Sequence, residues 1–370
     1  MSSLLQLSVL CLAYGGASRA KVLALLLGVA LAPSTALTPG KVIVVGSHNQ
    51  DLITSGARIP RPGETVLHDT FSQAFGGKGA NQAVQAALLG AETHFVGKVG
   101  DDAYGAAALE NLRDRGVLID NVRTTKTAPT GVAFVAVGKE DETNSIVVVP
   151  GANFELTPDD IDAKIFDGAG VLLCQLEIPQ ATTLRALEHA AAAGFVSVLN
   201  TAPVPPGGVD DALLRAASIV CPNEVELALL AGANEKATAA TVAGAVCAAK
   251  DLQRRGAKCV LATLGGNGSL LVEGDLAIHV PVVAADVIDT TGAGDSFLGA
   301  FAAGKSAGLS TLAAVRAAGV VAARSVQGRG AQPSYATAAD LDLDALPAVE
   351  ALPASSGLFT LREDGTIAGR

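Results

Sequence analysis

Short apolar runs alternate along this chain with longer stretches of helical period. The first run, Lys41–Gly46 (KVIVVG), is continuously apolar and ends in glycine, which is typical of a strand buried in a parallel sheet. Similar runs occupy Thr93–Val99, Gly131–Val137, Ser145–Val149, Val171–Gln175, Phe195–Leu199, Ser218–Cys221 and Cys259–Leu264. Helical patterns lie between many of them, at Ala80–Leu89, Asp102–Arg115, Pro179–Ala193 and Thr238–Arg255, and a glycine follows each of the last three. This order predicts an α/β fold with a doubly wound, mainly parallel sheet flanked by helices.

Two stretches interrupt the alternation, at about 49–72 and 127–150. Both contain short runs of β-type residues separated by polar or Pro/Gly turns, and neither shows a helical period. We expect them to form a small β-sheet that acts as a lid over the carboxyl edge of the main sheet, where such folds bind ligands.

Residues 1–40 differ from the rest of the chain. They contain no Asp or Glu, and Arg19 and Lys21 are their only basic residues. Two largely apolar runs, Leu4–Ala13 and Val22–Ala32, are each shorter than the ~18 residues that a membrane span needs. This composition predicts a targeting presequence that is cleaved off. No later run is long enough to span a bilayer, so we expect no membrane partner.

The composition argues against nucleic-acid binding. Apolar residues make up 49% of the chain and charged residues 17%, which is typical of a globular protein with a large core. Aromatic residues are only 4%, Trp is absent and the net charge is −10, so a stacking surface and a positive field are both lacking. A phosphorylated ligand must therefore be held by a local arrangement of groups.

One phosphate-loop match is misleading. Gly299–Ser306 (GAFAAGKS) fits the pattern G-x-x-x-x-G-K-[ST] at every position. In that loop, however, the first glycine must leave a strand and a helix must begin at the end of the motif. Because Asp295–Ala303 already has a helical pattern, we reject the match and expect Lys305 to be a cation at the C-terminus of a helix.

A better phosphate site is predicted at Asp289–Asp295 (DTTGAGD). A strand-like segment, Val280–Ile288, runs into this turn and a helix begins at its end. The backbone N–H groups of Gly292–Gly294 would then point outward at a helix N-terminus and bind an anion without a lysine. Asp295, in the first helical turn, could take a proton from a hydroxyl that attacks the phosphate. The alternative is an ordinary turn with Asp295 as a helix cap.

Other polar residues stand at predicted strand ends and helix starts. They are Asn49 and Asp51 after the first strand, Lys78 and Asn81 in Gly76–Asn81 (GGKGAN), Glu177 after the strand that ends at Gln175, and Asn223 and Glu226 at a later helix start. Each alone could be an ordinary turn or cap residue. Together with the anion site they predict a small polyhydroxylated substrate and a phosphate donor.

Two long motifs and several shorter ones carry a resemblance to a known family. The long ones are FGGKGANQAV (75–84) and DTTGAGDSFLGAF (289–301), and the others are GSHNQD (46–51), PGETV (62–66), QLE (175–177), NTAP (200–203), PNEVE (222–226), TLGGNG (263–268) and GRGAQPS (328–334). From about Lys41 to Ser334 the chain resembles the ribokinase branch of the phosphofructokinase-B type sugar kinases.

The resemblance implies a ribokinase-like fold and the transfer of a phosphoryl group from ATP to the 5-hydroxyl of D-ribose. Asp295 would be the general base, and the amides of Gly292, Ala293 and Gly294 would form the anion hole. The sugar would be held by Asn49, Gln50, Asp51, Gly77, Lys78, Gly79, Ala80, Asn81, Glu177 and Asp295.

The same resemblance implies a nucleotide site and two cations. The ATP site would comprise Asn223, Thr263, Leu264, Gly265, Gly266, Asn267, Gly268, Gly294, Asp295 and Gly319. Glu226 would organise Mg²⁺ through water, and an activating K⁺ would lie near Asp289, Thr291, Ser325, Gly328, Gly330 and Ser334. The lids of two subunits would pair in a homodimer.

These implications divide the chain into a presequence (1–40), a kinase domain (41–336) and a C-terminal tail (337–370). Because a sugar kinase needs ATP, the cytoplasm or an organelle is favoured over secretion, and the presequence makes us expect an organelle, a plastid, with the cytoplasm as the alternative.

His48 and Gly319 depart from the family pattern. A small or apolar residue is more usual at position 48, and a polar residue is more usual at position 319. The rival functions are fructokinase, adenosine kinase, keto-deoxysugar kinase and a catalytically silent sugar-binding relative. GGKGAN with QLE favours ribose, and the intact Asp295 argues against the silent relative.

Overall fold

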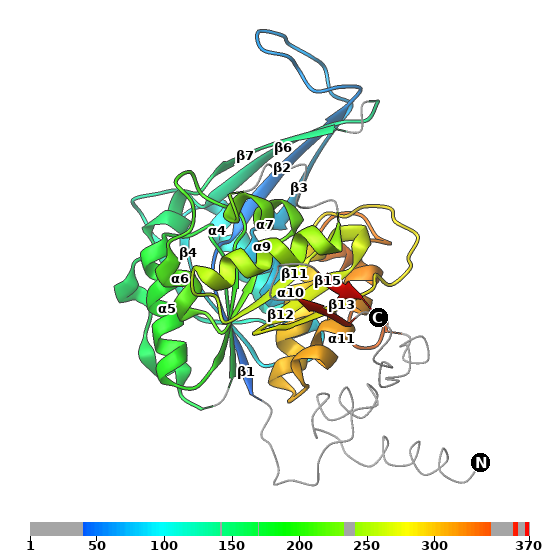
Figure 1. Cartoon of the computed structure of the whole chain (residues 1–370). Helices are drawn as coiled ribbons and strands as arrows, with labels where there is room; N and C mark the ends of the chain where they lie inside the picture. Colours follow the sequence, from blue (N-terminus) through cyan, green and yellow to red (C-terminus); the bar gives the residue numbers. More distant parts are fainter. Residues whose placement is uncertain are drawn as a thin grey trace, which may run out of the picture.

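The described part of the chain forms two β-sheets, with helices on both faces of the larger one (Figure 1). The computed structural model describes residues 40–140, 143–168, 170–232, 241–341, 358–361 and 367–369. Residues 1–39 of the predicted presequence lie outside the described residues, while Gly40 already donates its N–H to Ser306 O at 3.0 Å. The predicted α/β class with a separate small sheet is confirmed.

The larger sheet has eleven strands in the order β15-β14-β13-β12-β11-β10-β9-β8-β1-β4-β5. Its parallel part consists of Lys41–Val45 (β1), Thr93–Gly100 (β4), Leu118–Thr125 (β5), Gly170–Cys174 (β8), Val196–Asn200 (β9), Ile219–Cys221 (β10) and Cys259–Thr263 (β11). The antiparallel strands are Ser269–Glu273 (β12), Leu276–Val280 (β13), Leu358–Leu361 (β14) and Ile367–Gly369 (β15). Strand β1 pairs with β4 on one side and β8 on the other. The strand order therefore reverses at β1, and ligands of such folds bind at this point of the carboxyl edge.

Helices cover both faces of this sheet. They are Lys78–Leu88 (α3), Ala103–Asp114 (α4), Gln180–Ala192 (α5), Asp211–Ala216 (α6), Glu224–Leu230 (α7), Val242–Arg254 (α9), Ala293–Ser306 (α10) and Thr311–Ser325 (α11). Alternate residues of β1 enter the two cores, as the pleat requires. Ile43 belongs to the core that contains Leu187 of α5, whereas Val44 belongs to the core that contains Val84 of α3 and Phe301 of α10.

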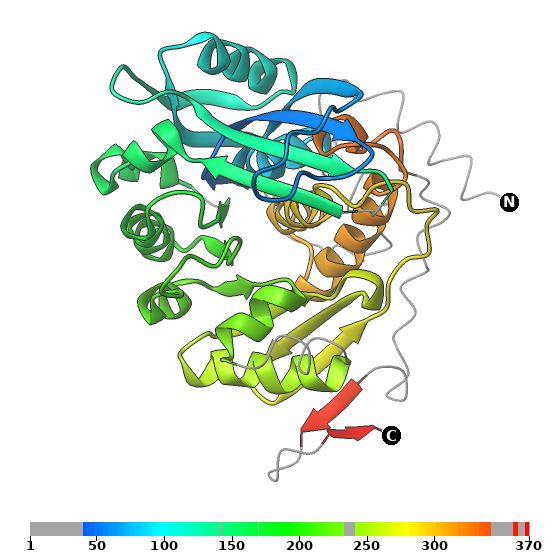
Figure 2. The ribbon, with the colours of Figure 1, turned by 90° about the horizontal axis from the view of Figure 1, so that it is seen from above.

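The lid is a four-stranded sheet in the order β3-β2-β6-β7. Its strands are Asn49–Gly56 (β2), Thr70–Gly76 (β3), Gly131–Gly138 (β6) and Thr143–Val149 (β7). Because β2 begins just after β1 ends, the lid rises from the carboxyl edge of the main sheet (Figure 1). Figure 2 shows the lid strands, in blue and green, at one end of the molecule and β14 and β15, in red, at the other.

The strand predicted for Val280–Ile288 is wrong. Strand β13 ends at Val280, whose partner Ser269 is the first residue of β12, so the ladder has no further residue to pair with. Pro281 follows and lacks a backbone N–H, and residues 281–288 form an irregular loop.

The rejected phosphate loop lies inside a helix, as predicted. Gly299 and Lys305 both belong to α10, and a Cβ on Gly299 would lie 2.6 Å from Gln82 O, so this glycine serves helix packing. Lys305 Nζ donates to Leu309 O at 3.0 Å beyond the end of α10, and partial burial lowers its pKa.

Part of the segment predicted as a tail adds to the main sheet. Strand β14 pairs antiparallel with β13, and β15 pairs with β14. Within the described part of the chain, no helix combines the length and the apolar character needed to cross a membrane.

Candidate active site

Glycines let the start of α3 pack against the segment that follows β1. Gly77 has a φ of 87°, and a Cβ there would lie 2.6 Å from Asn49 N. A Cβ on Gly79 would lie 2.7 Å from Ser47 N, and Ala80 N donates to Ser47 O at 2.9 Å. A side chain at Gly77 or Gly79 would therefore push the two segments apart, and the glycines bring two groups of predicted substrate residues together.

The carboxylate of Asp295 is buried in the first turn of α10. Asn81 Nδ2 donates to Asp295 Oδ2 at 3.0 Å, and Gln82 Nε2 donates to Asp295 Oδ1 at 2.9 Å. Both donors come from α3, so two helices far apart in the sequence fix the orientation of one carboxylate. Each oxygen keeps a lone pair for a further hydrogen bond or a proton.

A chain of buried amides extends from Asp295 on both sides. Gln332 Nε2 donates to Asn81 Oδ1 at 3.1 Å, and Gln175 Nε2 donates to Gln82 Oε1 at 2.7 Å. Sequence reasoning gave Gln82 and Gln332 no role, although both lie within the motifs FGGKGANQAV and GRGAQPS. The network restricts both neighbours of the carboxylate, which makes Asp295 a rigidly placed group.

The N-terminus of α10 presents unpaired amides beside Asp295. Gly292 has a φ of 74°, and a Cβ there would lie 2.6 Å from Ala331 Cβ, so the turn requires glycine. Ala293 N donates to Thr290 O at 3.2 Å, whereas the N–H groups of Gly294 and Asp295 have no acceptor among the described residues. A Cβ on Gly294 would meet no atom within 4 Å. The predicted anion hole is therefore corrected at Ala293, whose N–H is already bonded, while the first-turn amides of Gly294 and Asp295 remain free to bind an anion.

Glu177 links the β1 segment to α3. Its Oε2 accepts hydrogen bonds from Ser47 Oγ at 2.5 Å and from Lys78 N at 3.0 Å. Its Oε1 has no donor among the residues described and can accept from a ligand hydroxyl.

Lys78 is the cation that faces the carboxylates of the site. Burial disfavours its charge, but Asp295, Glu177 and Glu226 outweigh this effect and raise the pKa of Lys78 above its ordinary value. The ammonium therefore stays protonated and supplies positive charge to this cluster of carboxylates.

Asp51 lies on β2 and faces the same cluster of charges. Burial, together with Glu177 and Asp295, raises the pKa of Asp51 from its ordinary value to about 7. A Cβ on Gly76 would lie 2.3 Å from Asp51 Oδ2, so the glycine makes room for this carboxylate against β3. Without ligand, Asp51 changes charge near neutral pH.

We expect Asp51→Asn to raise thermal stability at pH 8 more than at pH 5. Since the pKa of Asp51 is raised in the folded protein, its contribution to stability is present below its unfolded pKa and is lost as the pH rises towards 7. The neutral amide avoids that loss. Melting temperatures of both proteins from pH 5 to pH 8.5 measure the effect. An equal difference at the two ends of the range would contradict it.

Gln50 and His48 lie differently from the other residues of the β1–β2 segment. Gln50 is predicted to bind substrate, but its Nε2 donates to Ala74 O of the lid at 3.0 Å, and its place in β2 puts it on the opposite face from Asn49 and Asp51. The His48 ring is buried beside Phe75, with 6.1 Å between ring centroids, and burial lowers its pKa to about 4. A neutral imidazole therefore packs against strand β3 of the lid.

Asn223 and Glu226 form a capping box at the start of α7. Asn223 Oδ1 accepts from Glu226 N at 2.8 Å, and Glu226 Oε2 accepts from Asn223 N at 3.0 Å. Burial raises the pKa of Glu226, and Lys78 acts in the opposite direction. The two residues thus cap a helix, and the charge of Glu226 reaches the site.

Two of the predicted nucleotide residues, Gly268 and Gly319, border the segment 280–283. Thr263 N donates to Pro222 O at 3.0 Å, next to the capping box, and the loop that follows contains the short 3-10 helix Gly265–Asn267 (η4). A Cβ on Gly268 would lie 2.2 Å from Val280 O, and one on Gly319 would lie 4.0 Å from Val283. Gly268 and Gly319 therefore border the same segment.

The predicted K⁺ residues come together near the DTTGAGD turn. Asp289 Oδ1 accepts from Thr291 N at 2.9 Å, and Asp289 Oδ2 accepts from Gly330 N at 2.8 Å. Burial opposes ionisation of Asp289, but hydrogen bonds from the Thr291 hydroxyl and from these two backbone amides hold its pKa below the ordinary value. A Cβ on Gly328 would lie 2.8 Å from Ser334 Cβ, so the two ends of the segment 328–334 lie close together.

Comparisons with known proteins agree with this geometry. Residues 40–338 match the pfkB family carbohydrate kinase model. Ribokinase of Mus musculus is 39% identical over 308 residues, which cover 82% of this chain and 94% of the mouse protein. Ribokinase of Arabidopsis thaliana is 39% identical over 304 residues, which cover 79% of this chain and 78% of that protein.

A solved structure of Arabidopsis thaliana ribokinase complexed with ribose and ATP has the same fold. Its TM-score is 0.75 at 36% sequence identity, and the match covers 84% of this chain and 99% of that one. The resemblance inferred from the motifs is therefore confirmed. This chain belongs to the pfkB family of carbohydrate kinases.

Proposed function

We propose that this protein transfers the γ-phosphoryl group of ATP to the 5-hydroxyl of D-ribose. The observation that carries the proposal is the fixed carboxylate of Asp295 beside the open amides of Gly294 and Asp295. That arrangement places a proton acceptor next to an anion site, which a hydroxyl attacking a phosphate requires. The mouse and Arabidopsis relatives, both ribokinases, support ribose over the fructokinase, nucleoside kinase and keto-deoxysugar kinase alternatives.

Asp295 takes the proton of the attacking hydroxyl. As the sugar oxygen forms its bond to the γ-phosphorus, the bond from that phosphorus to the leaving oxygen of ADP breaks. The proton passes to the carboxylate of Asp295 and from there to solvent. The amides at the N-terminus of α10 and the ammonium of Lys78 stabilise the charge on the transferring group.

The sugar is held by groups with free hydrogen-bonding capacity. Asp51 and Glu177 Oε1 accept from hydroxyls, while Asn49 and Lys78 donate. The support is that Glu177 and Asp295 act on the charges of both Asp51 and Lys78, and that Asn49 N lies beside Gly77.

Mg²⁺ fits the charge balance of the site. Carboxylates outnumber Lys78, since Asp51, Glu177, Glu226 and Asp295 all influence this cluster, and a triphosphate adds further negative charge. Both oxygens of Glu226 already accept hydrogen bonds from Asn223, so we propose contact through water, as Mg²⁺ commonly makes. When bound, the ion neutralises phosphate charge during the transfer.

We also propose K⁺ at the loops around Asp289. Among the described residues no three His, Cys, Asp or Glu side chains gather as a metal site, so backbone and hydroxyl oxygens would be the main ligands. The ionised Asp289 and the contact of Gly328 with Ser334 support the choice. Equal rates in KCl and NaCl would overturn it.

The lid is proposed to pair with the lid of a second copy. One face of it carries exposed apolar side chains, namely Phe71, Phe134, Val147 and Val149. Cross-strand pairing puts them on the face of Leu52, whereas Asn49 and Asp51 alternate to the other face, towards the site. A monomer would leave this apolar patch in water.

We expect Phe134→Glu to convert a dimer into a monomer. The new charge would be buried without a partner at the centre of the paired lids. Size-exclusion chromatography with light scattering measures the mass, and Leu276→Glu, at an exposed position of β13, is the control that stays dimeric. A monomeric wild-type protein or a dimeric Phe134→Glu variant would contradict the proposal.

Residues 1–40 are proposed to direct the protein to an organelle, a plastid. The support is the acid-free, Ser/Ala-rich composition of this segment. Sequencing the N-terminus of the protein isolated from its source tests the idea, and a mature chain that starts at Met1 would oppose it.

The reaction itself is tested by ADP release with a panel of substrates. The panel contains D-ribose, 2-deoxyribose, fructose, adenosine and a keto-deoxysugar acid. We expect the highest kcat/KM with ribose. A higher value with another substrate would overturn the assignment of ribose, and binding of sugar without ADP release would point to the silent relative.

A further inference from the structure

A buried asparagine that is not among the predicted site residues holds the beginning of strand β2 in place. Asn153 lies in the 3-10 helix Gly151–Glu155 (η1), directly after the lid, and is 1% exposed. Its Oδ1 accepts from His48 N at 3.0 Å, and its Nδ2 donates to His48 O at 3.0 Å and to Asn49 Oδ1 at 2.9 Å. Both N–H donors of this side chain are therefore used, one on Asn49, the first residue of β2, and one on His48 just before it.

These contacts fix which atom Asn49 turns towards the site. A backbone N–H can only donate, so His48 N determines that the facing atom of Asn153 is the oxygen. The NH₂ group of Asn153 must then face Asn49, and the atom of Asn49 that meets it must be its oxygen. The NH₂ group of Asn49 is left, with no acceptor among the described residues.

The sequence makes room for this contact. A Cβ on Gly131, the first residue of β6, would lie 2.3 Å from Asn153 Nδ2 and 2.5 Å from Asn49 Oδ1. Any larger residue would separate the two amides. The starts of β2 and β6 and the exit from β7 therefore meet at the side chain of Asn153.

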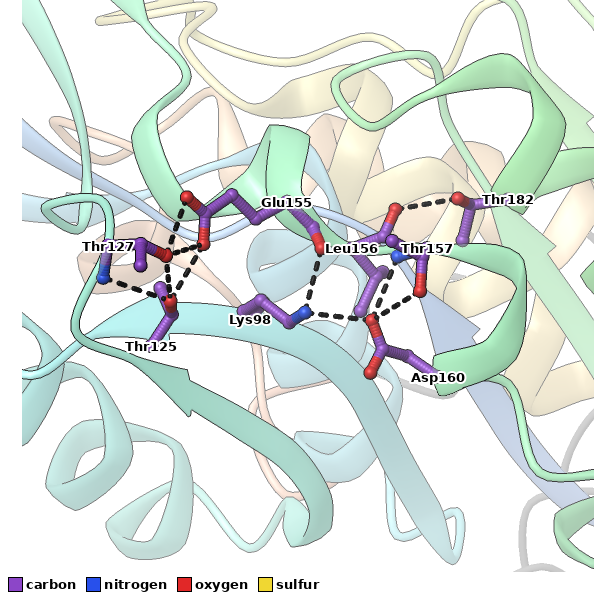
Figure 3. A network of polar contacts seen from close by, with 8 residues as sticks. All are labelled: Lys98, Thr125, Thr127, Glu155, Leu156, Thr157, Asp160 and Thr182. Carbon is purple, nitrogen blue, oxygen red and sulfur yellow. Dashed lines mark hydrogen bonds and ion pairs between the residues drawn. The ribbon is translucent and has the colours of Figure 1, made fainter.

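The segment that carries Asn153 is also anchored to the main body. Lys98 of β4 donates to Glu155 O at 2.7 Å and pairs with Asp160 at 2.8 Å (Figure 3). Thr182 of α5 donates to Leu156 O at 2.6 Å. The segment around Asn153 is thus tied to the main sheet and to α5 as well as to the lid.

We propose that Asn153 is a positioning residue that makes Asn49 an obligate hydrogen-bond donor to the substrate. This inference rests on the proposed function, because it assigns the group that Asn49 meets. Asn49 and Asp51 share a face of β2. A hydroxyl at this place accepts from Asn49 and donates to Asp51, which a deoxy carbon cannot do. Asn153 therefore contributes to the choice of sugar without touching it.

A double-mutant cycle of Asn49→Ala and Asn153→Ala tests the proposal. We expect Asn153→Ala to raise KM for the sugar about tenfold, the loss of about one hydrogen bond, and to leave KM for ATP within about twofold. In the Asn49→Ala background the same change should alter the sugar KM by less than about twofold, because its target is gone. Should Asn153→Ala fail to fold, Asn153→Asp takes its place, since it keeps the acceptor for His48 N and loses both donors.

Thr182→Val is the control, because it removes a buried hydrogen bond of the same segment without touching an amide of the site. We expect a lower melting temperature and an unchanged sugar KM. Equal effects of Asn153→Ala in both backgrounds, or an equal rise of KM for ATP, would overturn the inference.

The cycle is run with whichever sugar the wild-type enzyme phosphorylates best. If that sugar is not ribose, the proposed function fails and the inference is still tested. If the wild type phosphorylates no sugar, both fail.

Discussion

Replacing Asp295 by alanine is expected to lower kcat by about 10²–10⁴ while KM for ATP and for the sugar change little. The carboxylate is the proton acceptor in the proposed transfer, and its two oxygens are oriented by Asn81 and Gln82. Removing it leaves the amides at the N-terminus of α10 in place. Binding therefore persists, and the loss is confined to the chemical step.

The measurement is steady-state ADP release, with ATP binding followed by calorimetry. Gln332→Leu is a useful comparison, because it breaks the hydrogen bond to Asn81 behind the carboxylate and leaves Asp295 itself intact. We expect a smaller loss of kcat from this variant than from Asp295→Ala. Near-normal turnover of Asp295→Ala would refute the role of Asp295 as the base.

The second large effect on activity is expected from alanine at Gly294, and alanine at Gly292 in the same turn is its comparison. Gly294→Ala should keep or raise stability, because the position is helical, the added Cβ meets no atom within 4 Å, and alanine is favoured over glycine in helices by about 1 kcal/mol. Its methyl group would nevertheless stand beside the open amides and narrow the space left for a phosphate. We expect kcat/KM to fall by about 10², comparable to the loss of one donor to a transition-state anion.

Gly292→Ala should behave in the opposite way and unfold more easily. Its φ of 74° disfavours alanine, and the Cβ would lie 2.6 Å from Ala331 Cβ and 2.7 Å from the Tyr335 hydroxyl. The free energy of unfolding should fall by about 1–3 kcal/mol. Denaturant unfolding and kinetics of both variants separate the two roles. An active Gly294→Ala enzyme would show that no phosphate occupies this space.

Most of the main sheet could be predicted because a strand buried on both faces leaves a local pattern. KVIVVG needs both of its faces apolar, since Ile43 and Val44 enter different cores. The segment 281–288 has the same β-branched residues but forms no strand, because pairing depends on the length of β12, which the segment itself does not encode.

The residue types of the candidate site could be predicted from local motifs, but the hydrogen bonds that join them could not. Asp295 and Lys78 stand at helix starts, which their glycine-rich surroundings indicate. Gln82, Gln332 and Asn153 act through side-chain hydrogen bonds to residues far along the chain, and no local pattern predicts such pairs. Gln50 is the opposite case. It lies within a predicted binding motif, but its side chain donates to Ala74 O of the lid.

The identity of the phosphorylated product tests the central claim most directly. Wild-type protein is incubated with D-ribose, ATP and Mg²⁺, and the product is analysed by phosphorus and proton NMR. We predict one ADP for each ribose 5-phosphate, with phosphorus coupled to the protons on C5, and no such product from Asp295→Ala. Phosphate on another carbon, or ADP released without a sugar phosphate, would contradict the account.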